Sequence, residues 1–467
     1  GRDLAGAIKP MTADHGKTGF KSTTRHVMPA DRVRYVGDTV AVVLADDPYL
    51  LEDALELVEV DYADLPAVIT VDEALADGAP LLHPEIGDNV PFVTAACTDG
   101  FDDAFAAADL VVADSFTSTR MAGVSLEPRG CMAVWDRGLG SLTLWSSTQV
   151  PHLLRSALAE LLDLPESRLR VVAPDVGGGF GPKAHVYPEE VVAAALARRT
   201  GRPVKWVGDR QDDFVTTTHA RDYRLHLEMG LARDGTILAV RNRLDVNIGA
   251  YVCFPFGANA EIGGGAIYLP GAYRFAHYDY VARSIMTNKA PTGVYRGVAA
   301  PIAHMAAEGL LDRAAARLGL DPVELRRRNL VQPEDYPHVN AAGIRSDSGS
   351  HVECLRIALQ EIGYDEVRRG QPADRLRNGK LHGIGVVCIT EHTGQGAARY
   401  RARGLHRVPG FEGVVVRIEP DGQVIAATSQ ATQGQGHLTA FAQVIAENLG
   451  LGPEDVTVME GDTATAP

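Results

Sequence analysis

The first ninety residues alternate between apolar and polar segments in a way that predicts a small α/β unit. Residues 33–45, VRYVGDTVAVVLA, hold a β-branched apolar run that is typical of a buried strand. Residues 47–57, DPYLLEDALEL, favour a helix, because Pro48 stands in the first turn, where a helix accepts proline. The segment VEVDY at 58–62 then predicts a second strand.

A longer alternation of strands and helices follows. Apolar residues at helical spacing, closed in two cases by a glycine, predict helices at residues 151–164, 187–201 and 301–319. The predicted strands cover residues 141–148, 168–176, 222–230 and 237–246. The Asp-Gly pair in ARDGT, between the last two strands, predicts a β-hairpin.

The C-terminal part begins a further unit of the same kind. It predicts strands at 383–390 (GIGVVCIT) and 413–420 (GVVVRIEP), a loop at ATQGQGH and a helix at 438–450. We therefore expect a mixed α/β and α+β fold. The predicted domains are residues 1–95, 96–345 and 346–467.

Charge and cysteine content narrow the possible functions. The formal net charge of −15 and the lack of a basic, aromatic-interleaved patch argue against a nucleic-acid partner. No apolar run approaches the roughly 18 residues that span a bilayer. Five scattered cysteines without a CxxC pair argue against a disulfide framework, a zinc site or an iron–sulfur cluster on this chain. A reducing cytoplasm is the location that these cysteines favour.

Both ends of the sequence are unusual for a complete protein. The chain opens at GRDLAGAIKP without an initiator methionine, and it stops at the turn-like EGDTATAP. We therefore expect a fragment or one piece of a split polypeptide.

The segment DVGGGFGPKAHVYPEE, residues 175–190, places a glycine-rich loop between a predicted strand and a predicted helix. Such a loop lets backbone N–H groups approach a bound group closely. GGGFG matches neither GxGxxG nor GxxxxGKS, so the nucleotide-binding motifs are disfavoured. A plain tight turn would account for the glycines but not for Phe180 among them.

Three other loops stand in the same position, between a strand and a helix. WSSTQV presents Gln149, APTGVYRGVAAP presents Arg296, and ATQGQGH presents Gln435. Polar side chains at such positions line the crevice of an α/β scaffold. Amides can donate to an oxo group, and a guanidinium binds a planar anion.

These loops, in this order, resemble the large molybdenum-binding subunit of the xanthine dehydrogenase/aldehyde oxidase family, the molybdenum hydroxylases. VRYVGDTVAVVLAD…LVEVDYADLPAV is similar to the family's N-terminal hammerhead domain. SLEPRGCMAVWD, LWSSTQVPH, VGGGFGPK, APTGVYRGVAAPIAHMAAE, LGLDPVELRRRNL and TQGQGHLTAFAQ resemble its molybdopterin-binding domains. The resemblance covers essentially the whole chain.

The resemblance implies an oxidoreductase that hydroxylates a carbon of an aldehyde or an N-heteroaromatic ring with oxygen from water. It implies a molybdenum–molybdopterin cofactor, in the cytosine dinucleotide form, and electron transfer to partners. The expected partners are a [2Fe-2S] small subunit, an FAD medium subunit and, for a split polypeptide, a companion chain with the rest of the large subunit.

Site residues carry over from the family loop by loop. Gln149 matches the glutamine that hydrogen-bonds an oxo ligand of molybdenum, and Arg296 matches the arginine that lines the site. Phe180 matches the residue whose backbone N–H faces the metal and whose ring borders the substrate. The remaining cofactor-binding glycines and glutamine are Gly178, Gly179, Gly181, Gly434, Gln435 and Gly436. No side chain is expected to ligate molybdenum, because the pterin supplies its sulfur ligands.

Two departures from the family pattern bear on the chemistry. The family's general-base glutamate is expected after residue 467, and Glu127, Glu189 and Glu391 are not its equivalents. Purine-oxidising members have a glutamate where this chain has Ala184, which disfavours a xanthine-like substrate. The arginine loop, APTGVYRGVAAP, has no cysteine to bind the copper of carbon-monoxide dehydrogenases, so CO is disfavoured as well.

Two other functions are considered beside this one. A cofactor-free paralogue could serve as a binding or assembly subunit, and a nucleotide-dependent dehydrogenase could use the glycine loop for phosphate. The mismatch to both nucleotide motifs argues against the dehydrogenase.

Overall fold

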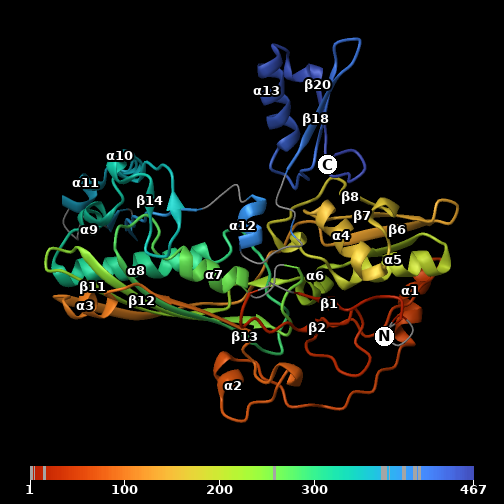
Figure 1. The fold of residues 1–467 in the computed structure, drawn as a ribbon, viewed down its shortest axis with the longest axis horizontal. Helices are drawn as coiled ribbons and strands as arrows, with labels where there is room; N and C mark the ends of the chain where they lie inside the picture. Colours follow the sequence, from red (N-terminus) through yellow and green to blue (C-terminus); the bar gives the residue numbers. More distant parts are fainter. Residues whose placement is uncertain are drawn as a thin grey trace.

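The computed structural model describes residues 4, 6–13, 17–255, 259–369, 376–377, 379–391, 396–402, 408 and 412–466. Two larger lobes, each built on its own β-sheet, lie side by side, and a smaller C-terminal unit projects from them (Figure 1). The N-terminal segment runs along one edge of the molecule. The mixed fold class predicted from sequence is confirmed.

The N-terminal segment is only partly the α/β unit that its pattern predicted. Helix α1 (Pro48–Glu56) forms as expected, with the Asp47 side chain accepting a hydrogen bond from the amide of Tyr49 at 2.8 Å. The strands predicted at 33–45 and 58–62 are wrong, because neither stretch pairs with another strand. The other elements here are β1 (Met11–Thr12), β2 (Thr24–Arg25), α2 (Val71–Leu75) and the 3-10 turn η1 (Pro84–Ile86).

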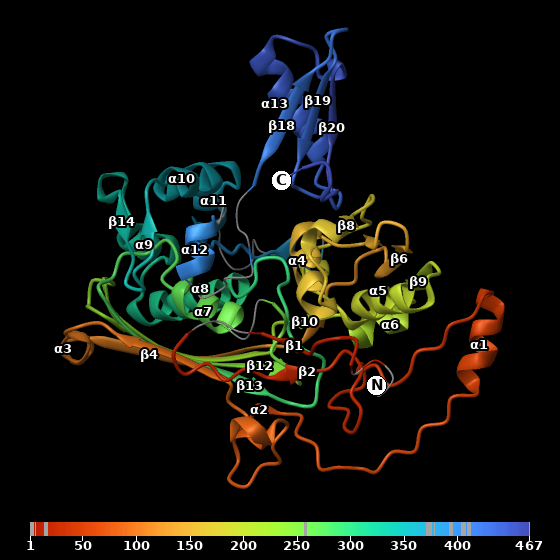
Figure 2. The ribbon, with the colours of Figure 1, turned by 45° about the vertical axis from the view of Figure 1, so that its right-hand side comes forward.

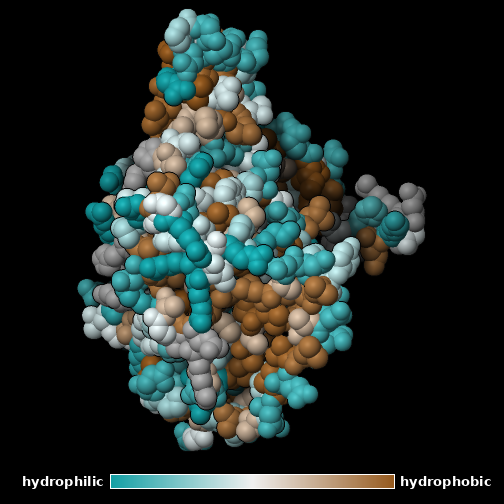
Figure 3. Space-filling view, turned by 90° about the vertical axis from the view of Figure 1, so that its right-hand side faces the viewer, coloured by the Kyte–Doolittle hydropathy of each residue, from teal (hydrophilic) through white to brown (hydrophobic). Residues whose placement is uncertain are grey.

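The unpaired stretches leave apolar side chains in contact with solvent. Val36 in the first stretch is 90% exposed and Val60 in the second is 42% exposed, although both stretches have a strand pattern. A strand needs the N–H and C=O groups of a neighbouring strand, so the apolar pattern alone does not produce one. Figure 3, which faces the side of the molecule where α1 lies in Figure 1, shows a continuous apolar patch.

The first lobe carries the glycine loop. Its four-stranded sheet has the order β8-β7-β6-β9, with β7 and β8 parallel and the other pairs antiparallel. The strands are β6 (Gly130–Asp136), β7 (Ser141–Ser146), β8 (Leu169–Val172) and β9 (Val204–Val207). Helices α4 (Pro151–Leu162) and α5 (Pro188–Thr200) pack on the sheet and are confirmed, as is the Gly201 cap in the left-handed region. Figure 2 shows both helices beside this sheet.

The second lobe is a five-stranded sheet of order β3-β13-β12-β11-β4. Its strands are β3 (Phe92–Cys97), β4 (Leu110–Ser118), β11 (Tyr223–Leu231), β12 (Ile237–Gly249) and β13 (His277–Met286). The predicted hairpin is confirmed as the antiparallel pair β11–β12. Helices α7 (Asn259–Ile267) and α8 (Ala300–Leu318) cover one face of the sheet, and α8 ends at Gly319 as predicted (Figure 1).

The remaining elements between β3 and the C-terminal unit are short. They are α3 (Phe101–Ala106), β5 (Met121–Ala122), α6 (Arg210–Thr216), β10 (His219–Ala220), α9 (Pro322–Asn329), β14 (His338–Val339), β15 (Arg345–Ser346), α10 (His351–Glu361), α11 (Tyr364–Arg369), β16 (Leu376–Arg377), β17 (Lys380–Leu381) and α12 (Ala397–Ala402). Three-residue 3-10 turns lie at Glu166–Arg168, Pro182–Ala184, Pro333–Asp335 and Pro453–Asp455. The strand predicted at 383–390 is wrong, since these residues pair with no strand of the described chain.

The C-terminal unit consists of β18 (Val414–Ile418), β19 (Val424–Thr428) and β20 (Val456–Met459), with α13 (His437–Leu449) against the sheet. The strand predicted at 413–420 and the helix predicted at 438–450 are therefore confirmed. The segment after β20 joins the first lobe. Its Gly461 carbonyl accepts from the amide of Ala173 at 2.7 Å, and the Thr463 amide donates to the carbonyl of Val171 at 3.0 Å.

Cysteine and hydropathy predictions agree with the structure. All five cysteines are free, and Cys131, Cys253 and Cys388 are buried. Among the described residues, no helix is both long and apolar enough to cross a bilayer. The predicted domain boundaries and the cytoplasmic location stay predictions.

Candidate functional site

The sheet of the first lobe explains why two of the predicted loops meet. Strands β7 and β8 are parallel neighbours, so the loops at their carboxyl ends leave the same edge of the sheet. Gln149 follows β7 and the glycine loop, residues 177–181, follows β8. The Gln149 side-chain oxygen accepts from the Gly181 amide at 2.8 Å, and the Gln149 amide donates to the Lys183 carbonyl at 2.9 Å.

Glycine is required in this loop because neighbouring groups approach its backbone closely. A Cβ atom on Gly179 would lie 2.5 Å from Cδ of Gln149. A Cβ atom on Gly181 would lie 2.5 Å from the carbonyl oxygen of Val294, and Gly181 also has φ = +107°. Gly178 has φ = +95°. Gln149 and Val294 therefore pack closely against the backbone of this loop.

Phe180 connects the glycine loop to the arginine loop. Its carbonyl accepts from the amide of Arg296 at 2.9 Å, and its backbone has φ = +56°. This conformation is costly for a bulky residue, and Phe180 is 42% exposed. The structure therefore brings Gln149, Phe180 and Arg296 together from three separate strand-to-helix loops.

The three loops present hydrogen-bond donors that the described part of the chain leaves unused. The amides of Gly179 and Phe180 donate to no acceptor there, and neither does the side-chain NH₂ of Gln149. The guanidinium of Arg296 is exposed and has no ion-pair partner among the described residues. Backbone amides, a carboxamide and a guanidinium without acceptors fit an electron-rich group such as an oxo-metal centre or a phosphate.

A buried lysine supports the loop from behind. The ammonium group of Lys183, 3% exposed as a residue, lies 2.8 Å from Oε2 of Glu127. The same carboxylate oxygen accepts from the Gly177 amide at 2.8 Å, and the Glu127 amide donates to the Gly177 carbonyl at 3.1 Å. Burial lowers the pKa of Lys183, and the pairing with Glu127 opposes this shift.

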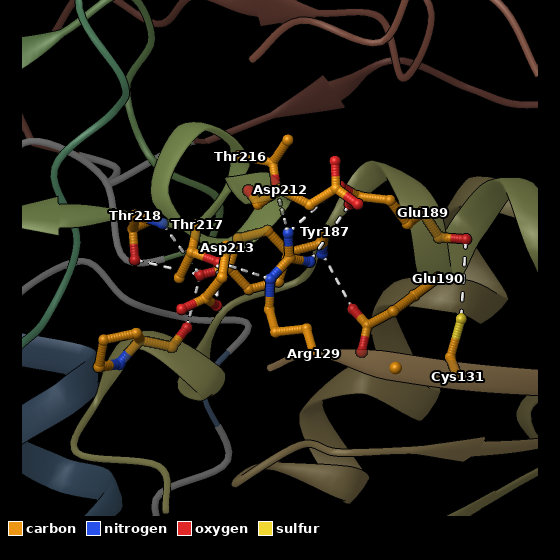
Figure 4. Close-up of polar contacts among 12 residues, drawn as sticks. Arg129, Cys131, Tyr187, Glu189, Glu190, Asp212, Asp213, Thr216, Thr217 and Thr218 are labelled. Atoms are coloured by element: carbon orange, nitrogen blue, oxygen red, sulfur yellow. Dashed lines mark hydrogen bonds and ion pairs between the residues drawn. The ribbon is translucent and has the colours of Figure 1, made fainter. Parts of the chain in front are cut away.

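Figure 4 shows the polar network below the loop. Arg129 is buried, donates to both oxygens of Glu189 at 3.2 and 3.3 Å, and lies 3.6 Å from the ring centroid of Tyr187. The Tyr187 hydroxyl donates to the Pro182 carbonyl at 2.6 Å, which connects the network to the 3-10 turn after the glycine loop. Both carboxylate oxygens of Glu189 are therefore occupied by Arg129.

Two titratable groups near this network have shifted pKa values. Burial raises the pKa of Glu190 to about 7, although Ser146 and the Tyr187 amide donate to its carboxylate. Burial lowers the pKa of His185 to about 4, so the imidazole is neutral near pH 7. The His185 Nε2 atom accepts from the Val294 amide at 3.0 Å, which ties the arginine loop to the glycine loop a second time.

The loop with Gly434, Gln435 and Gly436 lies in the C-terminal unit, apart from the other three residues. Among the described residues, Gln435 forms hydrogen bonds only with Gln433, and a Cβ atom on Gly434 or Gly436 would meet nothing within 4 Å. Near this loop, Glu460 directly precedes the segment that bonds to the first lobe. That carboxylate accepts from the Thr432 amide at 3.0 Å, and the charge of Asp175 raises its pKa further after burial.

Comparison with known proteins identifies this arrangement of loops. Two family models, each described as a molybdopterin cofactor-binding domain, match residues 82–330 and 357–467. A third, the a/b hammerhead domain of aldehyde oxidase and xanthine dehydrogenase, matches residues 6–66. This chain belongs to the molybdenum hydroxylase large-subunit family.

Relatives of this family are similar over nearly the whole chain. The carbon monoxide dehydrogenase large chain of Afipia carboxidovorans is 34% identical over 99% of this chain, and the nicotine 6-hydroxylase large subunit of Paenarthrobacter nicotinovorans is 33% identical over 97%. The structure of quinoline 2-oxidoreductase from Pseudomonas putida 86 superposes with a TM-score of 0.94 at 35% identity and covers all of this chain. The chain spans 59%, 55% and 59% of these relatives' own lengths.

The structure also shows supporting residues to which sequence reasoning assigned no role. Glu127 and Lys183 hold the glycine loop, His185 joins it to the arginine loop, and Arg221 donates to the carbonyl of Arg296. Lys183 follows the glycine motif directly, and Glu127 lies in SLEPRG, so both were visible as motif residues. The ion pair between them, which spans 56 positions, was not visible in the sequence, because hydrophobic periodicity does not specify contacts between two loops.

Proposed function

We propose that this chain is the molybdopterin-binding part of a molybdenum hydroxylase that oxidises an aldehyde or an N-heteroaromatic carbon. The observation that carries the proposal is the set of unused donors on Gly179, Phe180, Gln149 and Arg296 in the described chain, on three loops that hydrogen bonds join to one another. The family to which the chain belongs binds molybdopterin with these domains. We propose the cytosine dinucleotide form of the cofactor.

When bound, the molybdenum cofactor supplies oxygen derived from water and accepts two electrons from the substrate carbon. The residues of this chain bind the cofactor and the substrate and orient them. The Gln149 NH₂ group and the Phe180 amide are donors for oxygen atoms of the bound group, and their positions are set beforehand by the hydrogen bonds to Gly181 and from Arg296. No side chain of this site is needed as a metal ligand.

Phe180 and Arg296 have distinct roles on the substrate side. The exposed Phe180 ring provides an apolar surface against which a flat aromatic substrate can stack and from which water is excluded. The Arg296 guanidinium offers up to five N–H donors to an anionic or developing negative oxygen. Gly434, Gln435 and Gly436 are proposed to contact the pterin and its phosphates from the C-terminal unit.

The electrons have to leave this chain, since its five cysteines offer no cluster motif. We propose a [2Fe-2S] small subunit and an FAD medium subunit as the acceptors, with a companion chain where the large subunit is split. The relatives named above are large chains or subunits, as expected for heteromeric complexes. Neither CO nor xanthine is proposed as the substrate.

Metal and pterin analysis of the purified protein tests this function. Molybdenum in an amount comparable to the chain, with cytidine monophosphate released by acid hydrolysis, is the expected result. Protein that is folded but free of both would contradict the proposal and favour the cofactor-free assembly subunit. A retained nicotinamide nucleotide without molybdenum would favour the dehydrogenase instead.

A further inference from the structure

Arg221 is a charged residue beside the arginine loop that forms no ion pair with a carboxylate of the described chain. Arg129, by comparison, donates to both oxygens of Glu189. The Arg221 guanidinium instead donates to the backbone carbonyl of Arg296, and its Nε atom is buried without a hydrogen-bond partner among the described residues. Because an unpaired buried donor costs free energy, stability alone does not account for this arrangement.

The carbonyl that Arg221 holds belongs to the central peptide of a β-turn. The Val298 amide donates to the Tyr295 carbonyl at 2.6 Å, which closes the turn. Gly297, at the third position, has φ = +85°, whereas Arg296, at the second, is not among the described residues with positive φ. This combination defines a type II turn. Type I and type II turns differ by a rotation of the central peptide through roughly half a turn, and Arg221 donates to the carbonyl that this rotation would move.

Both peptides that flank the Cα atom of Arg296 are therefore held by other loops. The Arg296 amide donates to the Phe180 carbonyl at 2.9 Å, and the Arg296 carbonyl accepts from Arg221. The direction of a Cα–Cβ bond follows from the N, Cα and C atoms of the same residue. The two contacts together thus set the direction in which the Arg296 side chain leaves the backbone.

Arg221 is itself held by contacts on two sides. Its guanidinium lies 4.8 Å from the ring centroid of Tyr295, and its Nη1 atom lies 3.5 Å from Sδ of Met121. Its backbone has φ = +60°, a costly conformation for a residue other than glycine. Phe180 and Val298 share this feature, so three of the five described non-glycine residues with positive φ belong to the turn or contact it. Strain of this kind persists where surrounding contacts over-determine the backbone, and it clusters at functional sites.

We propose that Arg221 is a positioning residue, which holds the Arg296–Gly297 peptide in the type II orientation and so fixes the direction of the Arg296 side chain. The role of Arg296 on the substrate side rests on the proposed function, whereas the state of the turn does not. Without the Arg221 contact the peptide is free to rotate. The Arg296 guanidinium then loses the fixed placement that a donor to a developing negative oxygen requires.

Amide hydrogen exchange of the purified protein tests the state of the turn. It compares the wild type with Arg221→Ala and Arg221→Lys, by mass spectrometry of peptides that contain the Arg296 and Val298 amides. Both amides are hydrogen-bonded in the turn and are therefore protected from exchange while it is held. Arg137→Ala is the matched control, because the Arg137 guanidinium also donates to a backbone carbonyl, that of Thr200 at the end of α5.

We expect exchange in residues 294–298 to be about 10-fold faster in Arg221→Ala, with the rest of the chain unchanged. Arg221→Lys should lie between this variant and the wild type, because an ammonium group still donates to the Arg296 carbonyl but does not stack on an aromatic ring as a guanidinium does. The control should leave the segment unchanged. Equal exchange of the segment in the wild type and Arg221→Ala would overturn the inference. Faster exchange throughout the chain would overturn it too, since it indicates a general loss of stability.

Turnover of the cofactor-loaded complex tests the purpose of the turn. The quantity measured is kcat/KM, with benzaldehyde and with quinoline, for the wild type, Arg221→Ala, Arg296→Ala and the double variant. We expect Arg221→Ala to lower kcat/KM about 30-fold in the wild type but less than about 3-fold in Arg296→Ala, because no guanidinium is then left to position. Equal fold losses in the two backgrounds would overturn the positioning role.

Molybdenum content separates failure of this inference from failure of the proposed function. Arg221→Ala should hold as much molybdenum as the wild type. A lower content in the variant would assign Arg221 to cofactor retention and overturn its positioning role. A wild type without molybdenum would contradict the proposed function, and the exchange result alone would then decide whether Arg221 holds the turn.

Discussion

Two glycine loops of similar composition differ in what holds them. The loop at 177–181 is fixed by side chains from other elements, with Gln149 on one side and Glu127 on the other. The loop at 434–436 is held by its own turn, since within the described part of the chain Gln435 bonds only to Gln433 and both glycines border open space. Both loops nevertheless follow a strand and precede a helix.

The comparison of the two loops shows that backbone conformation and close packing are separate reasons for a glycine. Gly181 and Gly434 have nearly the same φ, +107° and +105°, so both require glycine for conformational reasons. Only Gly181 is also packed against neighbouring backbone. The first loop is therefore preorganised by the fold, which is what oriented donors for a reacting centre require, whereas the second is shaped for surface contact.

The largest expected effect is that of replacing Gln149, which braces the first loop. Gln149→Ala should reduce turnover about 100-fold, because it removes a positioned donor and the brace of Gly181. Its effect on the free energy of unfolding should stay near 1 kcal/mol, the usual worth of a hydrogen bond. Steady-state kinetics and urea unfolding measure the two quantities. A loss of activity that follows the loss of folded protein would show that Gln149 is only structural.

Gly181→Ala and Gly434→Ala compare a closely packed glycine with an unpacked one at nearly the same φ. We expect Gly434→Ala to cost about 1 kcal/mol of unfolding free energy, from backbone strain alone. Gly181→Ala should cost about 3 kcal/mol, because the added methyl group also meets the Val294 carbonyl. Urea unfolding of both variants measures the difference. Equal losses of unfolding free energy would mean that the neighbours of Gly181 move aside easily.

The pH dependence of stability should differ near the two loops. Burial raises the pKa of Glu261 to about 8, above the ordinary value of about 4.3 for an unfolded glutamate. The folded state thus keeps a proton that the unfolded state releases, so stability falls as pH rises through this window. Glu261→Gln should therefore gain stability relative to wild type between pH 5 and pH 8, approximately the interval between these two pKa values.

Glu460, beside the second loop, also has a raised pKa, caused first by burial and then by Asp175, and it is less buried. Glu460→Gln should show the same sign with a smaller gain, because solvent screens a partly exposed group. Thermal unfolding over the pH range checks both variants. A larger gain for Glu460→Gln would contradict the deeper burial of Glu261.

The smallest effect is expected for Gln435→Ala. Its hydrogen bonds stay within the loop, so the free energy of unfolding should change by less than about 0.5 kcal/mol. If the loop contacts the pterin, the variant should lose cofactor faster in dialysis than the wild type, which metal analysis measures. Unchanged retention would remove Gln435 from the cofactor site.

Local sequence patterns predicted several helices of the two lobes. Helix α4, helix α5 with its Gly201 cap and the long helix α8 were predictable, because apolar spacing is encoded within each segment and a glycine stop within the last two. The strands predicted at 33–45, 58–62 and 383–390 were not found. A strand pattern describes side chains, but a strand forms only where another strand offers its backbone groups.

The sequence by itself determined the four loops, their order and their residues. The reason is that it shows directly the glycines that allow positive φ and the polar residues beside them. Only the tertiary structure decided that Gln149, Phe180 and Arg296 lie together. It alone showed that Glu127 and Lys183 brace the loop and that Glu261 is buried. The physical reason is that these facts depend on contacts between distant segments, which hydrophobic periodicity does not specify.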